Sequence, residues 1–168
     1  MALFEKNLYV KKSTLPNAGK GLFTKVFIPK GSKVVEYKGK ITTWKEVKDD
    51  DGKNGYIFYV KRYHVIDALP TKKPLARYAN DARGLTRIKG VTNNCDYVTK
   101  ELKAYIESKK NIPAGSEIFV DYGPDYWKVI RENIAVDKTA KSKKSKKAKK
   151  SKKAKHKTAK RVNTHVKK

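Results

Sequence analysis

The sequence predicts a mainly β fold built from several small curved sheets with little helix. Short apolar or aromatic runs separated by Gly, Pro, Asn and Asp fill the chain from Leu8 to Asp121, which is typical of short strands. Two Pro-x-Gly segments, Pro29–Gly31 and Pro113–Gly115, place a rigid φ before a permissive one and predict tight turns ahead of strands. Only short stretches favour a helix, so small sheets fit better than an alternating α/β sandwich.

The predicted strands follow one another with short gaps. They cover residues 8–13, 21–28, 33–39, 55–60, 63–69, 97–108 and 117–123. We expect a hairpin where the fourth and fifth of these runs meet, with its turn at Lys61 and Arg62. Short helices are predicted over residues 42–50, over 75–82, where Pro74 is well tolerated at an early helical position, and over 125–134.

The positive charge of the chain is concentrated at its C-terminal end. Residues 138–168 hold sixteen Lys or Arg and no acid, so they carry +16 of the net charge of +26, and residues 1–137 carry +10. Because no aromatic or branched apolar residue occurs from Lys138 to Arg161, this tail cannot bury enough surface to offset the entropy of ordering. We therefore predict one folded domain over 1–137, with its core at about 8–127, and a disordered Lys-rich tail over 138–168.

The Lys-rich tail resembles the tails of linker histones and of bacterial histone-like proteins. Lysines spaced by Ser and Ala are expected to bind DNA or RNA through many phosphate contacts that read no bases, with an affinity that falls steeply with salt. A nuclear localisation signal, an anionic membrane surface and simple solubility are alternatives, although no apolar anchor supports the membrane. Nucleic acid is the first partner that we predict for Lys138–Lys168.

Cysteine usage and hydropathy limit the compartment and the cofactor class. The single cysteine, Cys95, excludes an internal disulfide, and no Cys/His cluster supplies the four ligands of a zinc site. No apolar run approaches the roughly 20 residues that span a bilayer, and the first twelve residues are too charged for a secretory signal. We expect a metal-free intracellular protein that accompanies nucleic acid in a nucleus, on a chromosome or in a nucleoid.

Four short segments occur in an order that resembles the SET domain, the fold of protein-lysine methyltransferases. They are AGKGLF (Ala18–Phe23), VEYKG (Val35–Gly39), IDA with LARYAND (Ile66–Asp81) and EIFVDYGPDYW (Glu117–Trp127). The resemblance covers roughly Leu8 to Trp127. It implies transfer of a methyl group from S-adenosylmethionine to a lysine of a histone or another basic chromatin or nucleoid protein.

The resemblance assigns several residues to the cofactor. Two glycines at a turn let the backbone approach a ligand closely, although the string alone more often marks an ordinary hairpin turn. The polar pair at 80–81 bonds local backbone or a ligand amide, and a Trp after the last strand covers either adenine or the edge of the core. The predicted cofactor-binding residues are Gly19, Lys20, Gly21, Leu22, Asn80, Asp81, Tyr122 and Trp127.

One of these positions departs from the family pattern. The family usually has Asn-His followed after a few residues by a second Asn, often with Cys. Here Asp81 stands in place of the His, and residues 82–93 intervene before Asn94 and Cys95. The intervening segment carries Arg83, Arg87 and Lys89 and is most simply an exposed loop, with contact to an acidic substrate or nucleic acid as the alternative.

Three tyrosines are the predicted catalytic residues. In isolation Tyr37, Tyr97 and Tyr122 each read as a strand aromatic packed in the core with its hydroxyl satisfied. The resemblance places all three around a narrow channel for the substrate lysine, whose pKa of about 10.4 must fall for the amine to react. Tyr122 is the predicted principal residue, and Tyr at position 97 implies few transferred methyl groups.

Two classes of function therefore remain in view. The first is a lysine methyltransferase held near its substrate by the tail, which would raise the local concentration. The alternative is a catalytically weak protein of SET fold that binds or compacts DNA, for which Asp81 is the indication. The tail itself is a third candidate, as the methylated substrate.

Overall fold

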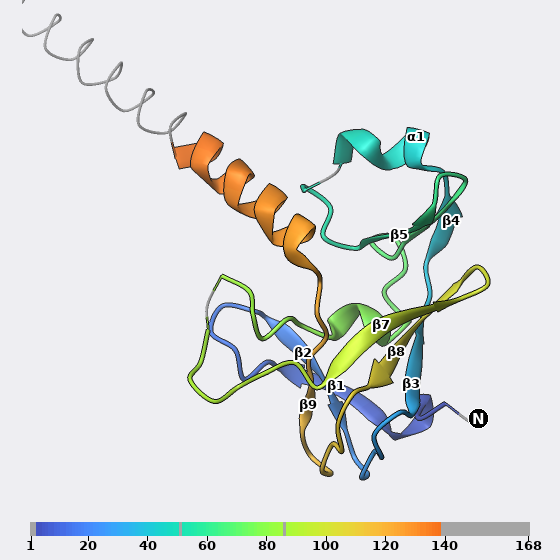
Figure 1. Cartoon of the computed structure of the whole chain (residues 1–168), viewed down its shortest axis with the longest axis vertical. Helices are drawn as coiled ribbons and strands as arrows, with labels where there is room; N and C mark the ends of the chain where they lie inside the picture. Colours follow the sequence, from blue (N-terminus) through green and yellow to red (C-terminus); the bar gives the residue numbers. More distant parts are fainter. Residues whose placement is uncertain (1–2, 51, 86, 139–168) are drawn as a thin grey trace, which may run out of the picture. The chain divides into compact units, whose positions relative to one another are not determined.

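The computed structural model describes residues 3–50, 52–85 and 87–138 of the chain. In these residues the strands form three small antiparallel sheets of three strands each, and helices before residue 124 are short (Figure 1). The predicted mainly β fold with little helix is confirmed. The chain divides into one unit that ends at Trp127 and a second that starts at Lys128.

Two of the three sheets take strands from distant parts of the sequence, and the third is built from residues 40–67. The first contains β1 (Leu8–Lys12), β2 (Lys20–Thr24) and β9 (Glu117–Ile118) in the order β1-β2-β9. The second contains β3 (Lys33–Tyr37), β8 (Lys103–Ser108) and β7 (Cys95–Lys100) in the order β3-β8-β7. The third contains β4 (Lys40–Thr42), β6 (His64–Asp67) and β5 (Ile57–Lys61) in the order β4-β6-β5.

Helical segments are single turns, except for the last. They are η1 (Glu5–Asn7), α1 (Trp44–Val47), η2 (Lys48–Asp50) and η3 (Ala76–Tyr78), followed by a helix over 124–138. The helix predicted over 42–50 is thus divided between α1 and η2, and the one predicted over 75–82 is wrong beyond a single turn. The helix predicted over 125–134 is confirmed and is longer than expected. The predicted tail lies almost entirely outside the described residues, so its disorder and its boundary after Asp137 stay predictions.

Both predicted Pro-x-Gly turns are confirmed. Gly31 has φ +78° and Gly115 has φ +81°, a region that only glycine enters without strain. The N–H of Ser32 donates to the carbonyl of Pro29 at 3.3 Å, and the N–H of Ser116 donates to that of Pro113 at 3.2 Å. The two turns have the same geometry, with Gly as the third residue of each.

The predicted strand over 97–108 is wrong, because it is two strands. β7 and β8 pair as a hairpin from Cys95 with Ser108 to Lys100 with Lys103, and Glu101 in the turn has φ +56°. No Gly, Pro or Asn marks this turn, which is why sequence patterning missed it. The other hairpin is confirmed, but Lys61 pairs with His64, so its turn lies one residue later than predicted.

Other strand boundaries were predicted too long. The run 21–28 ends as a strand at Thr24, and β9 keeps only two residues of the run 117–123. Among the remaining residues of the two runs, Ile28, Phe119 and Val120 make isolated bridges, such as Ile28 with Ile112. The core lies between the sheets, and its largest fully buried side chains include Phe23, Leu22, Ile28 and Ile106.

The segment after β9 lies between two other parts of the chain. The peptide unit that joins Phe119 to Val120 donates its N–H to the carbonyl of Asn80 at 2.9 Å and accepts at its C=O from the N–H of Cys95 at 2.9 Å. Since the two groups of a trans peptide point in opposite directions, Asn80 and Cys95 lie on opposite sides of this segment. The loop 81–93 connects Asn80 to the start of β7, and the segment at Phe119 and Val120 passes beside this loop.

The Asn94 side chain fixes this arrangement. Its Oδ1 accepts from the N–H of Phe119 at 2.8 Å, and its Nδ2 donates to the carbonyl of Glu117 at 2.8 Å. The residue is 7% exposed. The amide therefore satisfies one donor and one acceptor of a buried backbone that has too few strand partners.

We predict that Asn94→Ala lowers the free energy of unfolding by about 2–4 kcal/mol, because it leaves two buried backbone groups without partners. Urea denaturation measures the change. Asn111→Ala is the matched control, since the exposed Asn111 accepts from the N–H of Lys30, and it is expected to cost less than about 1 kcal/mol. Equal losses in the two variants would contradict this account of Asn94.

Candidate functional site

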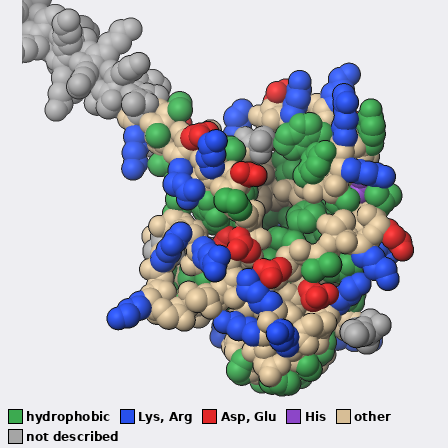
Figure 2. Space-filling view, in the orientation of Figure 1, with side chains coloured by type: hydrophobic (Ala, Val, Ile, Leu, Met, Phe, Trp, Pro, Cys, Tyr) green, Lys and Arg blue, Asp and Glu red, His purple; other side chains and the backbone are tan. Residues whose placement is uncertain are grey.

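The largest cavity of the site lies beside the turn between β1 and β2. Its volume is about 550 Å³, which is in the range of pockets that bind drug-sized organic molecules. Figure 2 shows a hollow in the surface with hydrophobic side chains gathered around it. Six of the eight residues predicted to bind a cofactor line the cavity: Gly19, Lys20, Asn80, Asp81, Tyr122 and Trp127.

A smaller cavity of about 80 Å³ adjoins the larger one. The three predicted catalytic tyrosines, Tyr37, Tyr97 and Tyr122, all line it. Gly55, Arg77, Tyr122 and Tyr126 line both cavities, so the two share a wall. Sequence reasoning missed three of these four residues. Only Tyr126 had a signal, since it stands next to Trp127 in an aromatic-rich segment.

The other two predicted cofactor residues, Gly21 and Leu22, do not line either cavity. Leu22 is fully buried in the core. A Cβ on Gly21 would overlap the Glu117 carboxylate, so glycine there makes room for a neighbouring side chain. In contrast, Gly19 has φ +69° and lies open to the cavity.

The Glu117 carboxylate holds the turn that forms one wall of the larger cavity. Its oxygens accept from the Ser13 hydroxyl at 2.6 Å and from the Thr14 N–H and hydroxyl at 2.7 and 2.6 Å. The Asn80 amide donates to Glu117 at 3.3 Å and to the carbonyl of Lys20 at 3.0 Å. Asn80 therefore positions the turn through its backbone, whatever further contact it makes with a ligand.

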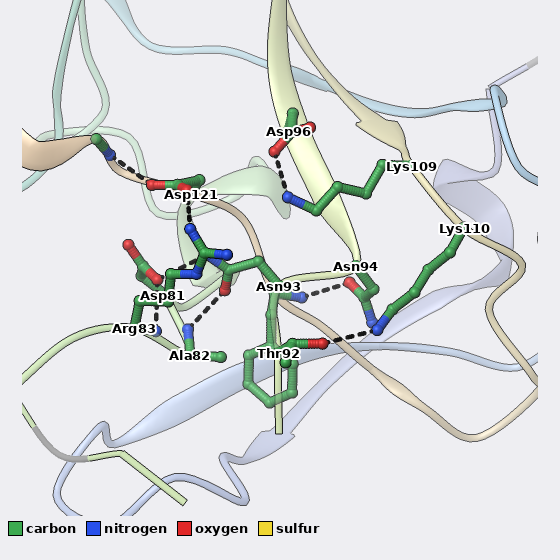
Figure 3. Close-up of polar contacts among 12 residues, drawn as sticks. Asp81, Ala82, Arg83, Thr92, Asn93, Asn94, Asp96, Lys109, Lys110 and Asp121 are labelled. Carbon is green, nitrogen blue, oxygen red and sulfur yellow. Dashed lines mark hydrogen bonds and ion pairs between the residues drawn. The ribbon is translucent and has the colours of Figure 1, made fainter. Parts of the chain in front are cut away.

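Asp81 is bonded to four N–H groups and is 5% exposed. Its Oδ1 accepts from the N–H of Arg83 at 2.7 Å and from the Asn93 amide at 2.8 Å, and Figure 3 shows both partners beside it. Its Oδ2 accepts from the N–H of Tyr122 at 2.9 Å and from the Trp127 indole at 2.7 Å. One carboxylate thus connects the loop 81–93 to Tyr122 and Trp127, two of the aromatic residues of the cavity wall.

The loop 82–93 is better anchored than the sequence predicts. Ala82 and Asn93 are buried, and the Asn93 amide oxygen accepts from the N–H of Ala82 at 2.8 Å. Ile88 and Val91 pack against a small cluster of buried residues that includes Leu15. The expectation of an exposed loop holds for its basic residues, such as Arg83, whose guanidinium pairs with Asp121 at 3.5 Å at the surface.

The three predicted catalytic tyrosines form part of the wall of the smaller cavity, and two of their rings are in contact. The Tyr122 hydroxyl donates to the carbonyl of Ala79 at 2.6 Å, and the Tyr37 hydroxyl donates to that of Tyr56 at 3.0 Å. The rings of Tyr37 and Tyr97 meet edge to face at 5.7 Å. The cavity therefore has an aromatic wall whose hydroxyls are partly committed to the backbone.

Burial keeps these tyrosines neutral. It is the main cause that raises the pKa of Tyr37, Tyr97 and Tyr122 well above the usual value, and neighbouring charges and hydroxyls contribute less. A phenol that is protonated at neutral pH donates a hydrogen bond and does not act as a base. Burial likewise raises the pKa of Cys95 to about 12, so its thiol is unsuited to nucleophilic attack.

Trp127 packs against aromatic neighbours and also borders the larger cavity, and its contact with an adenine stays a prediction. Its ring stacks on that of Tyr122, with 5.9 Å between the ring centroids and an interplanar angle of 13°. It meets the Tyr126 ring edge to face, with 5.0 Å between the centroids. It also lines the larger cavity. A Cβ on Gly84 would lie 2.7 Å from the indole, so glycine there allows the ring its position.

The part of the chain that the structure describes has no helix both long enough and apolar enough to cross a membrane. Within the same residues no group of three or more His, Cys, Asp or Glu is arranged to hold a metal ion.

Comparison with known proteins agrees with the geometry. The family model of the SET domain matches residues 19–123. Histone-lysine N-methyltransferase 2D of Homo sapiens is 31% identical over 133 residues, which are 73% of this chain and 2% of that protein, and its Mus musculus counterpart gives the same values. Histone-lysine N-methyltransferase set-17 of Caenorhabditis elegans is 30% identical over 121 residues, 70% of this chain and 41% of that protein.

We predict that the Tyr37 hydroxyl lowers the free energy of unfolding as the pH rises above about 10. The folded state keeps this phenol protonated, whereas the unfolded chain releases the proton above pH about 10, so stability is lost as the pH rises. At pH about 8, Tyr37→Phe should cost about 1 kcal/mol through its lost hydrogen bond. Above pH about 10 that difference should shrink by up to about 1.4 kcal/mol per pH unit.

Urea denaturation of both proteins between pH about 8 and about 11 measures the difference, in which the titration of the lysines cancels. Tyr63→Phe controls for the substitution itself, because the Tyr63 ring is 73% exposed. A difference between Tyr37→Phe and the wild type that is constant with pH would contradict the prediction.

Proposed function

Because the chain belongs to the SET domain family, we propose that it is a protein-lysine N-methyltransferase that uses S-adenosylmethionine. The observation that carries the proposal is the pair of cavities with a shared wall of Tyr122, Tyr126, Gly55 and Arg77. The larger cavity has room for a nucleoside with an amino-acid arm, and the smaller one has room for an unbranched side chain. Two ligands that enter from separate cavities would meet at this wall.

The residues present fit a cationic, partly aromatic cofactor. Backbone groups at Gly19 and Lys20 can bond its amino-acid arm, and the Trp127 ring offers a face to an adenine. The buried Asp81 carboxylate lines the same cavity and favours positive charge. When bound, the cofactor supplies an activated methyl group on a sulfonium.

The residues of the smaller cavity would prepare the substrate amine. A lysine in water is almost fully protonated at neutral pH, and an apolar aromatic channel lowers its pKa because it removes hydration from the charged form. The faces of Tyr37 and Tyr97 favour the cationic product. Each hydroxyl oxygen can accept a hydrogen bond from an N–H of the neutral amine while its own O–H donates to a backbone carbonyl, as those of Tyr37 and Tyr122 do. The lone pair of the amine then stays free to attack, so we propose that the hydroxyls position the amine and that Tyr122 contributes most.

We propose a basic chromatin protein, such as a histone, as the substrate. The three relatives are named histone-lysine N-methyltransferases, which favours chromatin over a nucleoid as the place of action. The matched part of this chain corresponds to only 2% of the length of the first of them. The proposal for the substrate therefore depends on the site and on the Lys-rich tail. In this proposal the tail over 138–168 binds nucleic acid and keeps the folded domain over 1–137 near its substrate.

The alternative of a weakened enzyme has less support than the sequence suggested. It rested on Asp81, and this carboxylate makes four short hydrogen bonds that organise the cavity wall. An eroded site would be expected to leave unsatisfied polar groups at such a position.

We predict that the full chain transfers labelled methyl from S-adenosylmethionine to histones and that Tyr122→Phe lowers the rate about a hundredfold. The estimate is the usual effect of removing one hydrogen-bonding group that is held in position at an active site. Tyr63→Phe, on the exposed hairpin turn, is the matched control and should keep the wild-type rate. No transfer by the wild-type chain, together with no binding of the cofactor, would sink the proposal.

We predict that the tail raises activity on DNA-bound histone but not on free histone. Residues 1–137 should match the full chain on free histone and be slower on nucleosomes at low salt. The advantage of the full chain should disappear between about 50 and about 200 mM salt, since counterion release drives such binding. An advantage that persists at high salt, or that also occurs with free histone, would argue against a tether.

A further inference from the structure

Among the residues that the structure describes, two buried carboxylates next to the larger cavity have no cationic partner. Asp81 and Glu117 are each 5% exposed. Their hydrogen-bond donors are backbone N–H groups, hydroxyls, side-chain amides and one indole, and all of these are neutral. In residues 3–50, 52–85 and 87–138 the ion pairs are Lys38 with Glu5, Arg83 with Asp121 and Lys109 with Asp96, all at the surface.

Such an arrangement leaves a negative potential in the cavity wall. Burying a carboxylate costs free energy unless donors or a cation compensate it, and neutral donors satisfy its lone pairs without cancelling its charge. Asp81 lines the cavity, whereas Glu117 does not. The Asp81 charge also contributes to the raised pKa of Tyr97, Tyr122 and Tyr126, so its field reaches the shared wall.

Two cations also line the larger cavity. Arg77 directs Nη1 to the carbonyls of Ala68 and Thr71 at 2.7 and 2.8 Å and lies over the Tyr56 ring at 4.1 Å. Lys20 is exposed. Both oppose the field of Asp81. Solvent screens the charge of the exposed Lys20, whereas Arg77 keeps its charge and offsets part of that field, so variants at position 81 measure what Asp81 itself contributes.

The charge of the ligand differs before and after the proposed reaction. S-adenosylmethionine has a positive sulfonium, and S-adenosylhomocysteine has a neutral thioether at the same atom. A fixed negative charge in the wall distinguishes these two otherwise similar ligands. Building on the proposed function, we propose that Asp81 is a specificity-determining residue whose carboxylate favours the cationic cofactor over its neutral product and so promotes product release.

The test compares dissociation constants by calorimetry. The ligands are S-adenosylmethionine, S-adenosylhomocysteine and sinefungin, an analogue that has a charged amine in place of the sulfonium methyl. The proteins are the full chain, Asp81→Asn, Asp81→Glu and Asp81→His, at a pH of about 8, where an ordinary His is neutral. The wild type should bind both cationic ligands about tenfold more tightly than the product, the effect of one unit charge several ångströms away.

The variants separate charge from geometry. Asp81→Asn and Asp81→His should lose most of the tenfold preference, whereas Asp81→Glu, which keeps the charge, should retain it. Trp127→Phe removes one hydrogen bond to Asp81 but leaves the charge. It should therefore raise the dissociation constants of all three ligands by a similar factor. Glu117→Gln removes the carboxylate that does not line the cavity and should change the preference less than Asp81→Asn does.

The outcomes distinguish the two proposals. Binding of all three ligands with the same preference in the wild type and in a folded neutral variant would overturn the role of Asp81 and leave the methyltransferase standing. Binding of none of them by the wild type would overturn the proposed function and this inference together. A wild type that prefers the neutral product would also overturn the inference, and that result requires no variant to fold.

Discussion

The rest of the structure depends on how the peptide unit between Phe119 and Val120 is held. It bonds to Asn80 on one side and to Cys95 on the other, and the Asn94 side chain completes the backbone pairing around it. β9 is only two residues long, so ordinary strand pairing would not fix this segment. Because Tyr122 and Trp127 follow within a few residues, their positions in the cavity wall depend on the same hydrogen bonds.

Two acidic residues, Glu117 and Asp81, connect the segment at Phe119 and Val120 to its surroundings. Glu117 joins the segment to Ser13 and Thr14 at the end of β1, and Asp81 joins it to the loop 82–93. Both therefore contribute to structure and to the electrostatics of the cavity. Keeping charged groups there has a cost in stability, which is offset by the number of donors that each carboxylate receives.

The proposed reaction places two opposite demands on charge at the shared wall. Negative charge in the wall stabilises a cationic cofactor, but it also favours the protonated, unreactive form of a nearby lysine. The aromatic lining and the sulfonium itself act in the other direction on the lysine. An acid that lies on the cofactor side and is surrounded by N–H groups, as Asp81 is, meets the first demand at the smallest cost to the second.

The sequence by itself determined the mainly β architecture, the two Pro-x-Gly turns and the family, because these depend on local patterns and short motifs. It also predicted, among the cofactor-binding residues, six that line one cavity. Only the tertiary structure decided the hairpin at Glu101, the shared wall at Arg77 and Tyr126, and the true reason for glycine at Gly21. The hairpin is local, but its turn carries no Gly, Pro or Asn that would mark it. The shared wall and Gly21 depend on contacts between residues far apart in the chain, such as Gly21 with Glu117, and no local pattern records such contacts.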